Sequence, residues 1–333
     1  MRPAPGLTLA WYCPAEGDGR FLGTLAPQRP PTFDYLLSVT RAAERAGARE
    51  ILIPTGVVND SYAPDATFAE SWTTAAALAV RTRSIRLIVA VNPAGASPAL
   101  IAHQVQTLEA SAPGRIALNL VAGGGPSDGY GHPPMNHDDR YQRLRTLVTA
   151  VRERFSGPLY LGGASPAAID LACEAVDTYL MWGERPQDIA DRIAAITTRA
   201  TRPIRFGVRI HIIARARAAD ARRRAHELVA PAAVQRARQA EYDGFDSVGQ
   251  GRMNALPADA DDWVAPGLWA GIRAVRGGAG TALVGSYDDV ADWLRRYRDV
   301  GVDMIIASGY PHREEVTRVS RHVWPRIEAS PNT

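Results

Sequence analysis

Short apolar runs alternate with amphipathic segments along almost the whole chain. Eight runs rich in Val, Ile and Leu are apolar at consecutive positions, which is typical of strands buried on both faces of a sheet. Between them, apolar residues recur at helical spacing. The predicted strands are 7–12, 50–54, 85–91, 116–121, 159–161, 178–181, 204–214 and 303–308, and the predicted helices are 33–46, 68–80, 98–110, 138–155, 165–176, 186–200 and 287–300.

This alternation predicts parallel strands joined by crossover helices. Eight strands of that kind favour an α/β fold that closes into a TIM (β/α)8 barrel, with one domain over residues 1–333. One stretch, about 215–280, is too long for a single crossover and combines Ala-Arg patches with several Gly and Pro residues. We expect it to form a long insertion before the last strand.

A doubly wound open sheet is the competing architecture. Its dinucleotide-binding form carries a G-x-G-x-x-G turn after the first strand and an acidic residue about 20 positions later. In this chain Cys-Pro-Ala-Glu-Gly follows the first predicted strand, and the glycine cluster at 277–280 has a different spacing. The sequence therefore provides no site for a nicotinamide dinucleotide and favours the closed barrel.

The composition excludes several classes of chemistry. The sequence contains no lysine, so all 38 residues counted as lysine plus arginine are arginine, and Schiff-base, P-loop and protein-kinase chemistry are excluded. A net charge of +3 gives no basic excess for nucleic-acid binding. Cys13 and Cys173 are far apart, and no run of about 18 apolar residues occurs. These features predict a cytoplasmic protein with no disulfide scaffold and no membrane contact.

In a TIM barrel the loops after the strands meet at one rim, which carries the active site. The residues that follow the predicted strands are rich in polar side chains and glycine. They include Thr55, Asn92, residues 122–125 and 162–165, Trp182, Glu184, Tyr310 and His312.

The segment from Gly162 to Pro166, Gly-Gly-Ala-Ser-Pro, follows the fifth predicted strand. Its two glycines let the backbone approach an anion, and Ser165 supplies a hydroxyl at the start of a helix. A phosphate site is one interpretation. The other is an ordinary helix start, with Ser165 as the N-cap and Pro166 in the first turn.

Arg209 and His211 alternate with apolar residues along a strand, so both point to the same face. Near the open rim, the Arg209 guanidinium could hold an oxyanion through two hydrogen bonds. The alternative is a buried ion pair with an acidic residue of a helix.

Tyr310 and His312 end the last strand and could donate hydrogen bonds or carry a proton at the same rim, although Tyr-Pro-His is also a common turn sequence. The spacings that a zinc site needs and the G-x-S-x-G of serine esterases are absent. Binding of an anionic cofactor fits these residues better than metal or serine hydrolysis.

Several longer motifs occur along the chain. They are LIPTG at 52–56, YLGG at 160–163, WGE at 182–184, FGVRIH at 206–211, VRGGAGTALVG at 275–285 and SGYPH at 308–312. On these motifs the chain resembles the bacterial luciferase-like flavin-dependent monooxygenases, and most closely their alkanesulfonate monooxygenase branch, over nearly its full length.

The resemblance implies a cofactor, a partner and a set of site residues. Reduced FMN (FMNH2), delivered by a separate NAD(P)H:flavin reductase, would react with O2 to give a flavin hydroperoxide that oxidises a small substrate. A homo-oligomer and a mobile lid at about 231–280 are also expected. By matching position, the flavin phosphate would be held by Gly163, Ala164, Ser165 and Tyr141. The rest of the flavin would be lined by Asn92, Asn119, Ala122 and His137. The substrate oxyanion or the peroxide would be handled by Arg209, His211, Arg276, Tyr310, His312 and Trp182.

The chain departs from the family pattern near the expected site. Glu16 stands where relatives carry a histidine, Asn59 lies where they carry a cysteine after LIPTG, and Ala122 replaces a threonine. A short turn at 152–158 also replaces a long segment of the relatives.

Three hypotheses follow. The first is a two-component monooxygenase that desulfonates an organosulfonate to an aldehyde and sulfite, with Arg209 and Arg276 binding the oxyanion. The second keeps the flavin chemistry but acts on a specialised metabolite. The third is a non-catalytic flavin-binding relative.

Overall fold

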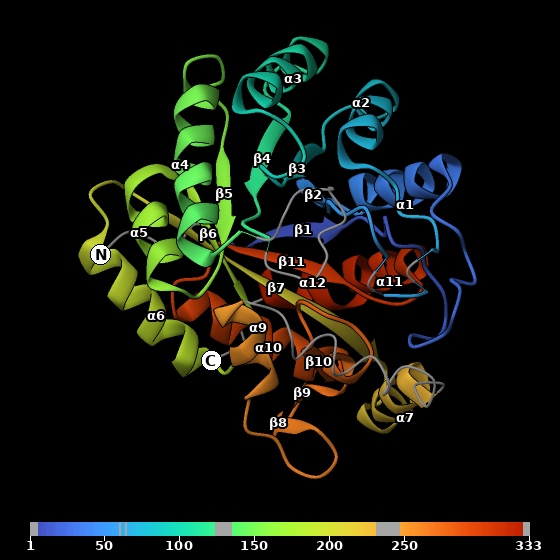
Figure 1. The fold of residues 1–333 in the computed structure, drawn as a ribbon. Coiled ribbons are helices and arrows are strands. Elements are labelled where there is room, and N and C mark those ends of the chain that lie inside the picture. Colours follow the sequence, from blue (N-terminus) through green and yellow to red (C-terminus); the bar gives the residue numbers. More distant parts are fainter. Residues whose placement is uncertain (1–5, 60, 64, 124–134, 231–246, 329–333) are drawn as a thin grey trace.

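The apolar runs form a closed barrel of eight parallel strands surrounded by helices (Figure 1). The computed structural model describes residues 6–59, 61–63, 65–123, 135–230 and 247–328. All eight predicted strands are present, and each end lies within one residue of its predicted position. The TIM-barrel prediction is therefore confirmed. The barrel strands are β1 (Thr8–Tyr12), β2 (Glu50–Ile53), β3 (Arg86–Val91), β4 (Ile116–Leu120), β5 (Leu159–Gly162), β6 (Thr178–Trp182), β7 (Arg205–Arg215) and β11 (Met304–Ser308).

Strand β7 is long enough to pair with two neighbours on one side. Its residues 207–211 pair with β11 and close the barrel, whereas residues 211–215 pair with β10 (Ala282–Ser286). Strand β10 then continues antiparallel into β9 (Leu268–Trp269), which pairs with β8 (Trp263–Ala265). Strand β10 was not predicted, because its short apolar run adjoins a glycine cluster that is typical of a loop.

Seven helices return the chain between the strands, as predicted. The first three are α1 (Phe33–Arg45), α2 (Ser71–Arg81) and α3 (Pro98–Ser111), followed by α4 (His137–Arg152), α5 (Pro166–Ala175), α6 (Pro186–Arg199) and α10 (Tyr287–Asp299). The C-terminal segment, which was not predicted, forms α11 (His312–Arg318), η4 (Val319–Val323) and α12 (Trp324–Glu328). It packs against α1 and α10 and so covers the last part of the barrel.

The predicted insertion lies between β7 and β11. Its described residues form α7 (Ala218–Val229), α9 (Val248–Asn254), β8, β9 and η3 (Gly271–Ala274). Helix α7 packs against β7 and β10. Residues 231–246, which belong to the lid expected from the sequence, lie outside the described residues.

Serine side chains start several of the helices. Ser97, Ser165 and Ser286 each accept a hydrogen bond from the backbone N–H three residues later, which satisfies a donor that the first helical turn leaves open. At Ser286 the bond is reciprocal, since the Asp289 carboxylate accepts from the Ser286 N–H. These caps fix the turns that carry the chain from the rim into the helices.

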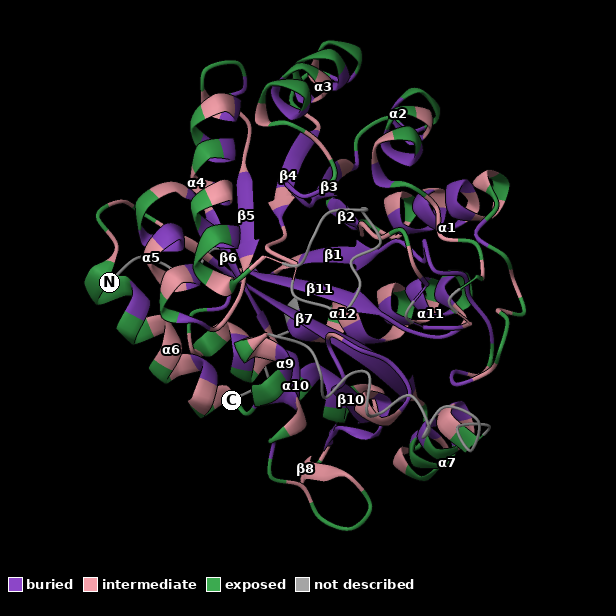
Figure 2. Ribbon diagram, in the orientation of Figure 1, coloured by how far each residue is buried: buried purple, intermediate pink, exposed green. Residues whose placement is uncertain are grey.

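Two apolar layers surround the strands. Tyr12, Leu52, Tyr160 and Ile306 belong to the cluster that fills the barrel interior, and a larger cluster lies between the strands and the helices. In Figure 2 the strands are buried, while the outer faces of the helices are exposed. At the amino end of the barrel, the Glu50 carboxylate accepts from Tyr160 Oη at 2.6 Å and from an Arg86 Nη at 3.1 Å.

Candidate active site

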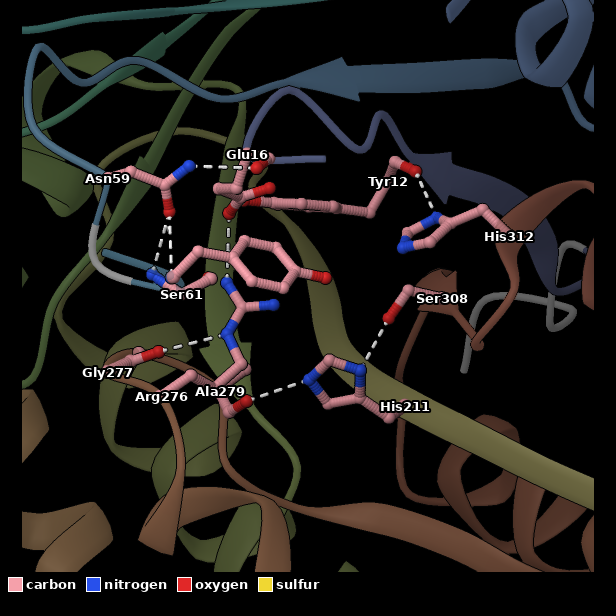
Figure 3. Close-up of polar contacts among 12 residues, drawn as sticks. Tyr12, Glu16, Asn59, Ser61, His211, Arg276, Gly277, Ala279, Ser308 and His312 are labelled. Carbon is pink, nitrogen blue, oxygen red and sulfur yellow. Dashed lines mark hydrogen bonds and ion pairs between the residues drawn. The ribbon is translucent and has the colours of Figure 1, made fainter. Parts of the chain in front are cut away.

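The predicted substrate residues converge at the carboxyl rim of the barrel. Arg209 and His211 lie on β7, Tyr310 and His312 follow β11, and Arg276 lies just after η3. Their side chains are all buried, and each contacts at least one other member of the group or a shared neighbour, Tyr12. Figure 3 shows His211, Arg276 and His312 of this group around Tyr12. Arg209 and Arg276 therefore lie on the same side of the molecule, although the sequence separates them by a long insertion.

Arg209 is buried against an aromatic face. Its Cζ atom lies 4.4 Å from the centre of the Tyr12 ring, and one Nη donates to the Ile210 carbonyl at 3.1 Å. Burial, and secondly the charge of Arg276, lowers the pKa of Arg209 to about 10. The guanidinium is thus charged at neutral pH. Among the residues that the structure describes, none places a carboxylate within 4.0 Å of it, so the helix ion pair considered from the sequence is not formed.

Arg276 is held by a carboxylate that the sequence did not assign to the site. One Nη donates to Glu16 Oε1 at 3.0 Å, and the other donates to Tyr310 Oη at 2.7 Å. Tyr12 Oη donates to the same Glu16 oxygen at 2.6 Å. The expectation that relatives carry a histidine where this chain has Glu16 was the sequence signal that drew attention to this position.

A second departure supports the first. The side-chain amide of Asn59 donates to the Glu16 backbone carbonyl at 2.8 Å, and its oxygen accepts from the N–H groups of Ser61 and Tyr62 (Figure 3). Asn59 is fully buried. Asn59 thereby fixes the loops after β1 and β2 to each other, with the Glu16 carboxylate in contact with Arg276.

Both ring nitrogens of His211 are occupied. The Ala279 carbonyl lies 2.9 Å from Nε2, and Ser308 Oγ lies 2.7 Å from Nδ1. Because a carbonyl can only accept, Nε2 carries the proton and Nδ1 accepts from the serine hydroxyl. Burial, followed by the charges of Arg209 and Arg276, holds the pKa of His211 well below its usual value. His211 is therefore neutral and positions its neighbours, including Tyr310, whose ring stacks on it with centroids 5.6 Å apart.

His312 leaves one nitrogen for a ligand. Its Nδ1 donates to the Tyr12 carbonyl at 3.1 Å, so Nε2 is the accepting nitrogen, and it has no partner among the described residues. Burial holds the pKa of His312 well below its usual value. The backbone N–H of His312 donates to the Asp18 carboxylate at 2.7 Å, which anchors the turn.

The loop after β5 is shaped for close approach. Gly163 has φ +149°, and a Cβ at this position would lie 2.7 Å from Ala168 Cβ and 2.9 Å from Tyr141 Oη. Ser165 caps α5 through the Ala168 N–H at 3.2 Å and also bonds Tyr141. Ser165 is thus an ordinary N-cap, which confirms the second interpretation of this segment in the sequence analysis. Because Gly163 carries no side chain, a bound phosphate could approach the backbone there, beside the half-buried Ala164.

The remaining predicted flavin residues surround the adjacent strand ends. Asn119 Oδ1, on β4, is buried and has no hydrogen-bond partner among the described residues. Asn92 Oδ1 accepts from the Ala94 N–H at 2.9 Å. Ala122 is half-buried after β4, and the His137 ring lies at the start of α4, 4.8 Å from the Tyr141 ring. The unpaired amide oxygen and the Gly163 turn fit a flavin, which has a polar ring edge and a phosphate.

Trp182 ends β6, where it pairs in register with Arg209 of β7, and its ring lies beside helix α9. A Cβ added to Gly249 of α9 would lie 3.6 Å from the Trp182 ring. Arg252 of α9 donates to both oxygens of the buried Glu184 carboxylate, the closer contact being 2.7 Å. Gln250 accepts from the Gly278 N–H at 2.8 Å, next to Arg276. Helix α9 thus ties the Arg276 loop to the rim, a role that the sequence did not assign to Glu184.

Two other site types are not formed by the described part of the chain. No group of three His, Cys, Asp or Glu side chains within it could hold a metal ion. No helix there is both long and apolar enough to cross a membrane.

The fold is therefore a TIM barrel whose carboxyl rim, where the active sites of this fold lie, carries basic and aromatic side chains beside a glycine-lined turn. The luciferase-like monooxygenase family matches residues 8–304, and the chain belongs to that family.

Solved structures agree on the fold. Riboflavin lyase with modified FMN and riboflavin is 17% identical with a TM-score of 0.78, covering 97% of this chain and 92% of its own. Long-chain alkane monooxygenase is 14% identical with a TM-score of 0.74, covering 98% and 92%. An F420-dependent secondary alcohol dehydrogenase with an F420-acetone adduct is 12% identical with a TM-score of 0.66, covering 97% and 99%.

Proposed function

We propose that the protein is an FMNH2-dependent, two-component monooxygenase that oxidises a small anionic substrate. An organosulfonate, cleaved to an aldehyde and sulfite, is the first candidate. The proposal is carried by the buried Arg209 guanidinium, which meets no carboxylate among the described residues and lies on the same rim as the residues that fit a flavin. Such a cation is costly to bury unless an anion binds to it.

The cofactor would lie along the ends of β3 to β5. Asn92, Asn119 and Ala122 would line it, with His137, Tyr141, Gly163, Ala164 and Ser165 towards its phosphate. When bound, FMNH2 supplies two electrons to O2, so that one oxygen atom enters the substrate and the other leaves as water. For a sulfonate, the balance is RCH2SO3⁻ + O2 + FMNH2 → RCHO + HSO3⁻ + FMN + H2O. Since the sequence offers no dinucleotide site, a separate NAD(P)H:flavin reductase would supply the FMNH2.

The chain's own residues bind and orient the substrate in this scheme. Arg209 holds the anionic group, and His312 Nε2 is placed to accept a hydrogen bond from a ligand at the rim. His211 acts as a positioning residue, because both of its nitrogens are engaged. Helix α9, fixed by Arg252 and Glu184, would limit the access of water to the site.

A specialised metabolite is the second candidate substrate. It is favoured by the Glu16–Arg276 pair, which occupies one of the two guanidiniums proposed to bind a sulfonate. The short turn after α4 also favours it, where Arg152 bonds the Gly157 carbonyl at 2.8 Å in place of the segment that relatives insert.

A direct assay tests the proposal. The protein, a flavin reductase, FMN, NADPH and O2 are combined with linear alkanesulfonates of increasing chain length, and sulfite is measured. Sulfite release that requires both FMN and O2 and is lost in Arg209→Met supports the function. Flavin binding without sulfite from any chain length would remove the sulfonate as substrate, and an absence of flavin binding would remove the monooxygenase itself.

A further inference from the structure

The Glu16 carboxylate joins the loop after β1 to the guanidinium of Arg276, which comes from the insertion. Its side chain is 6% exposed, and that of Arg276 is 7% exposed. Oε1 accepts from both Arg276 and Tyr12, whereas Oε2 accepts no hydrogen bond from any residue that the structure describes. The Oε2 oxygen is therefore placed to interact with, or to repel, a ligand bound at the proposed substrate site.

The charges of the three described side chains that contact Tyr12 can be summed, leaving out Asp18, whose carboxylate is engaged by the His312 backbone N–H. Arg209 and Arg276 carry one positive charge each, and Glu16 carries one negative charge. His211 and His312 are neutral, because burial holds the pKa of each well below its usual value. The three charged groups therefore give +1 − 1 + 1 = +1, with Arg209 as the cation that lacks a carboxylate partner among the described residues.

We propose that Glu16 is a specificity-determining residue, which masks Arg276 with an internal carboxylate so that the site accepts singly charged anions and rejects doubly charged ones. This rests on the proposed function, because it concerns the charge of the substrate at that site. A second negative charge on a ligand would face Glu16 at short range in a water-poor environment, where repulsion is strong.

Asn59 holds Glu16 in the position where it pairs with Arg276. It is the side chain that holds the Glu16 backbone, and its own contacts reach back to Thr67, Ser61 and Tyr62. Both Glu16 and Asn59 depart from the family pattern, and in the structure they are in direct contact. We infer that the two departures form a single unit that sets the charge of the site.

Glu50 provides a matched control for Glu16. It is also buried, accepts from a tyrosine hydroxyl at 2.6 Å and pairs with an arginine at 3.1 Å, but at the amino end of the barrel. A Glu50→Gln variant therefore removes the same charge and the same kinds of contact, far from the rim.

The experiment measures binding rather than turnover. Isothermal titration at pH 8 gives the dissociation constants of propanesulfonate, a monoanion, and 3-sulfopropionate, a dianion of similar size, for the full chain with FMN. Five proteins are compared: wild type, Glu16→Gln, Arg276→Gln, the double variant and the control Glu50→Gln. Glu16→Gln is expected to bind 3-sulfopropionate about tenfold more tightly, with a smaller gain for propanesulfonate.

The charge sum fixes the other results. Arg276→Gln lowers the sum to zero and should weaken both anions, whereas the double variant restores +1 and should return close to wild type. Glu50→Gln should change neither constant. If Glu16 merely positioned Arg276 as a clamp, Glu16→Gln and the double variant would both bind more weakly, and the proposal would be wrong.

The remaining outcomes are also decisive. Binding of neither anion by Glu16→Gln would overturn the proposal, since that variant should bind most tightly. If Glu16→Gln does not fold while Glu50→Gln does, the double variant decides, because a dianion preference unchanged from wild type supports the charge sum and a weaker one contradicts it. Binding in this pattern without any sulfite release would leave the specificity intact and remove only the desulfonation.

Discussion

Ser308 Oγ lies 2.7 Å from Nδ1 of His211, on the opposite side of the imidazole from the Ala279 carbonyl. The pair fixes one neutral tautomer of His211, with the proton on Nε2. We predict that His211 does not titrate between pH 5 and 8, because burial and two nearby arginines oppose its protonation. Long-range ¹H–¹⁵N spectra of histidine-labelled protein check this. A His211 signal that titrates near pH 6.5 would contradict it.

The Arg252–Glu184 pair is predicted to hold helix α9 on the rim. In Arg252→Gln the buried Glu184 carboxylate keeps the hydrogen bonds from Arg192, at 3.0 Å. Amide exchange in residues 248–254 should then become severalfold faster, because the helix opens more readily from the barrel. Arg217→Gln is the control, since it breaks an exposed pair with Asp220 on α7. Equal exchange in both variants would show that the pair does not anchor α9.

Asp18 is predicted to make stability depend on pH. Burial raises the pKa of Asp18 to about 7, against an opposing effect of its hydrogen bonds from Tyr35, His312 and Gly19. An unfolded aspartate titrates near pH 4, so the folded chain holds the proton more tightly. The stabilisation is complete below about pH 4 and is lost as the pH rises through 7. Urea unfolding of wild type and Asp18→Asn should show a free-energy difference that falls over this range. A difference independent of pH would contradict the raised pKa.

The turn at Gly163 is predicted to be essential for the cofactor. Gly163→Ala places a Cβ within 2.7 Å of Ala168 Cβ and 2.9 Å of Tyr141 Oη, besides straining a residue with φ +149°. FMN affinity should fall at least tenfold as the loop shifts. Gly114→Ala is the control, because Gly114 also has a positive φ, +73°, but meets nothing within 4 Å. Equal loss of FMN affinity in the two variants would argue against a cofactor at Gly163.

Most of the barrel could be predicted from the sequence, because strands buried on both faces leave an uninterrupted apolar signal. Strand β10 could not, since its apolar run borders glycines and its partner is the far half of β7. The terminal helix α11 was also missed. It begins at His312, inside a segment that the sequence analysis treated only as a site motif.

The candidate site was predictable as a set of residues but not as a set of contacts. The alternation of Arg209 and His211 along β7 indicates one face, and their neighbours follow from the convergence of strand ends. Nothing in the spacing indicates that Glu16 meets Arg276, because 260 positions separate them and the contact depends on how the insertion folds back. The engagement of both His211 nitrogens likewise depends on Ala279, which lies far along the chain.

We propose that the carboxyl rim binds reduced FMN. Anaerobic titration of the wild-type chain with FMNH2 and, separately, with reduced F420 tests it most directly, because one structure of similar fold holds modified FMN and another is of an F420-dependent enzyme. We expect saturable binding of FMNH2 to the wild-type chain and far weaker binding of reduced F420. Asn119→Leu and Gly163→Ala should weaken FMNH2 binding, whereas Gly114→Ala should leave it unchanged. Tighter binding of reduced F420, or FMNH2 binding that all three variants leave unchanged, would contradict it.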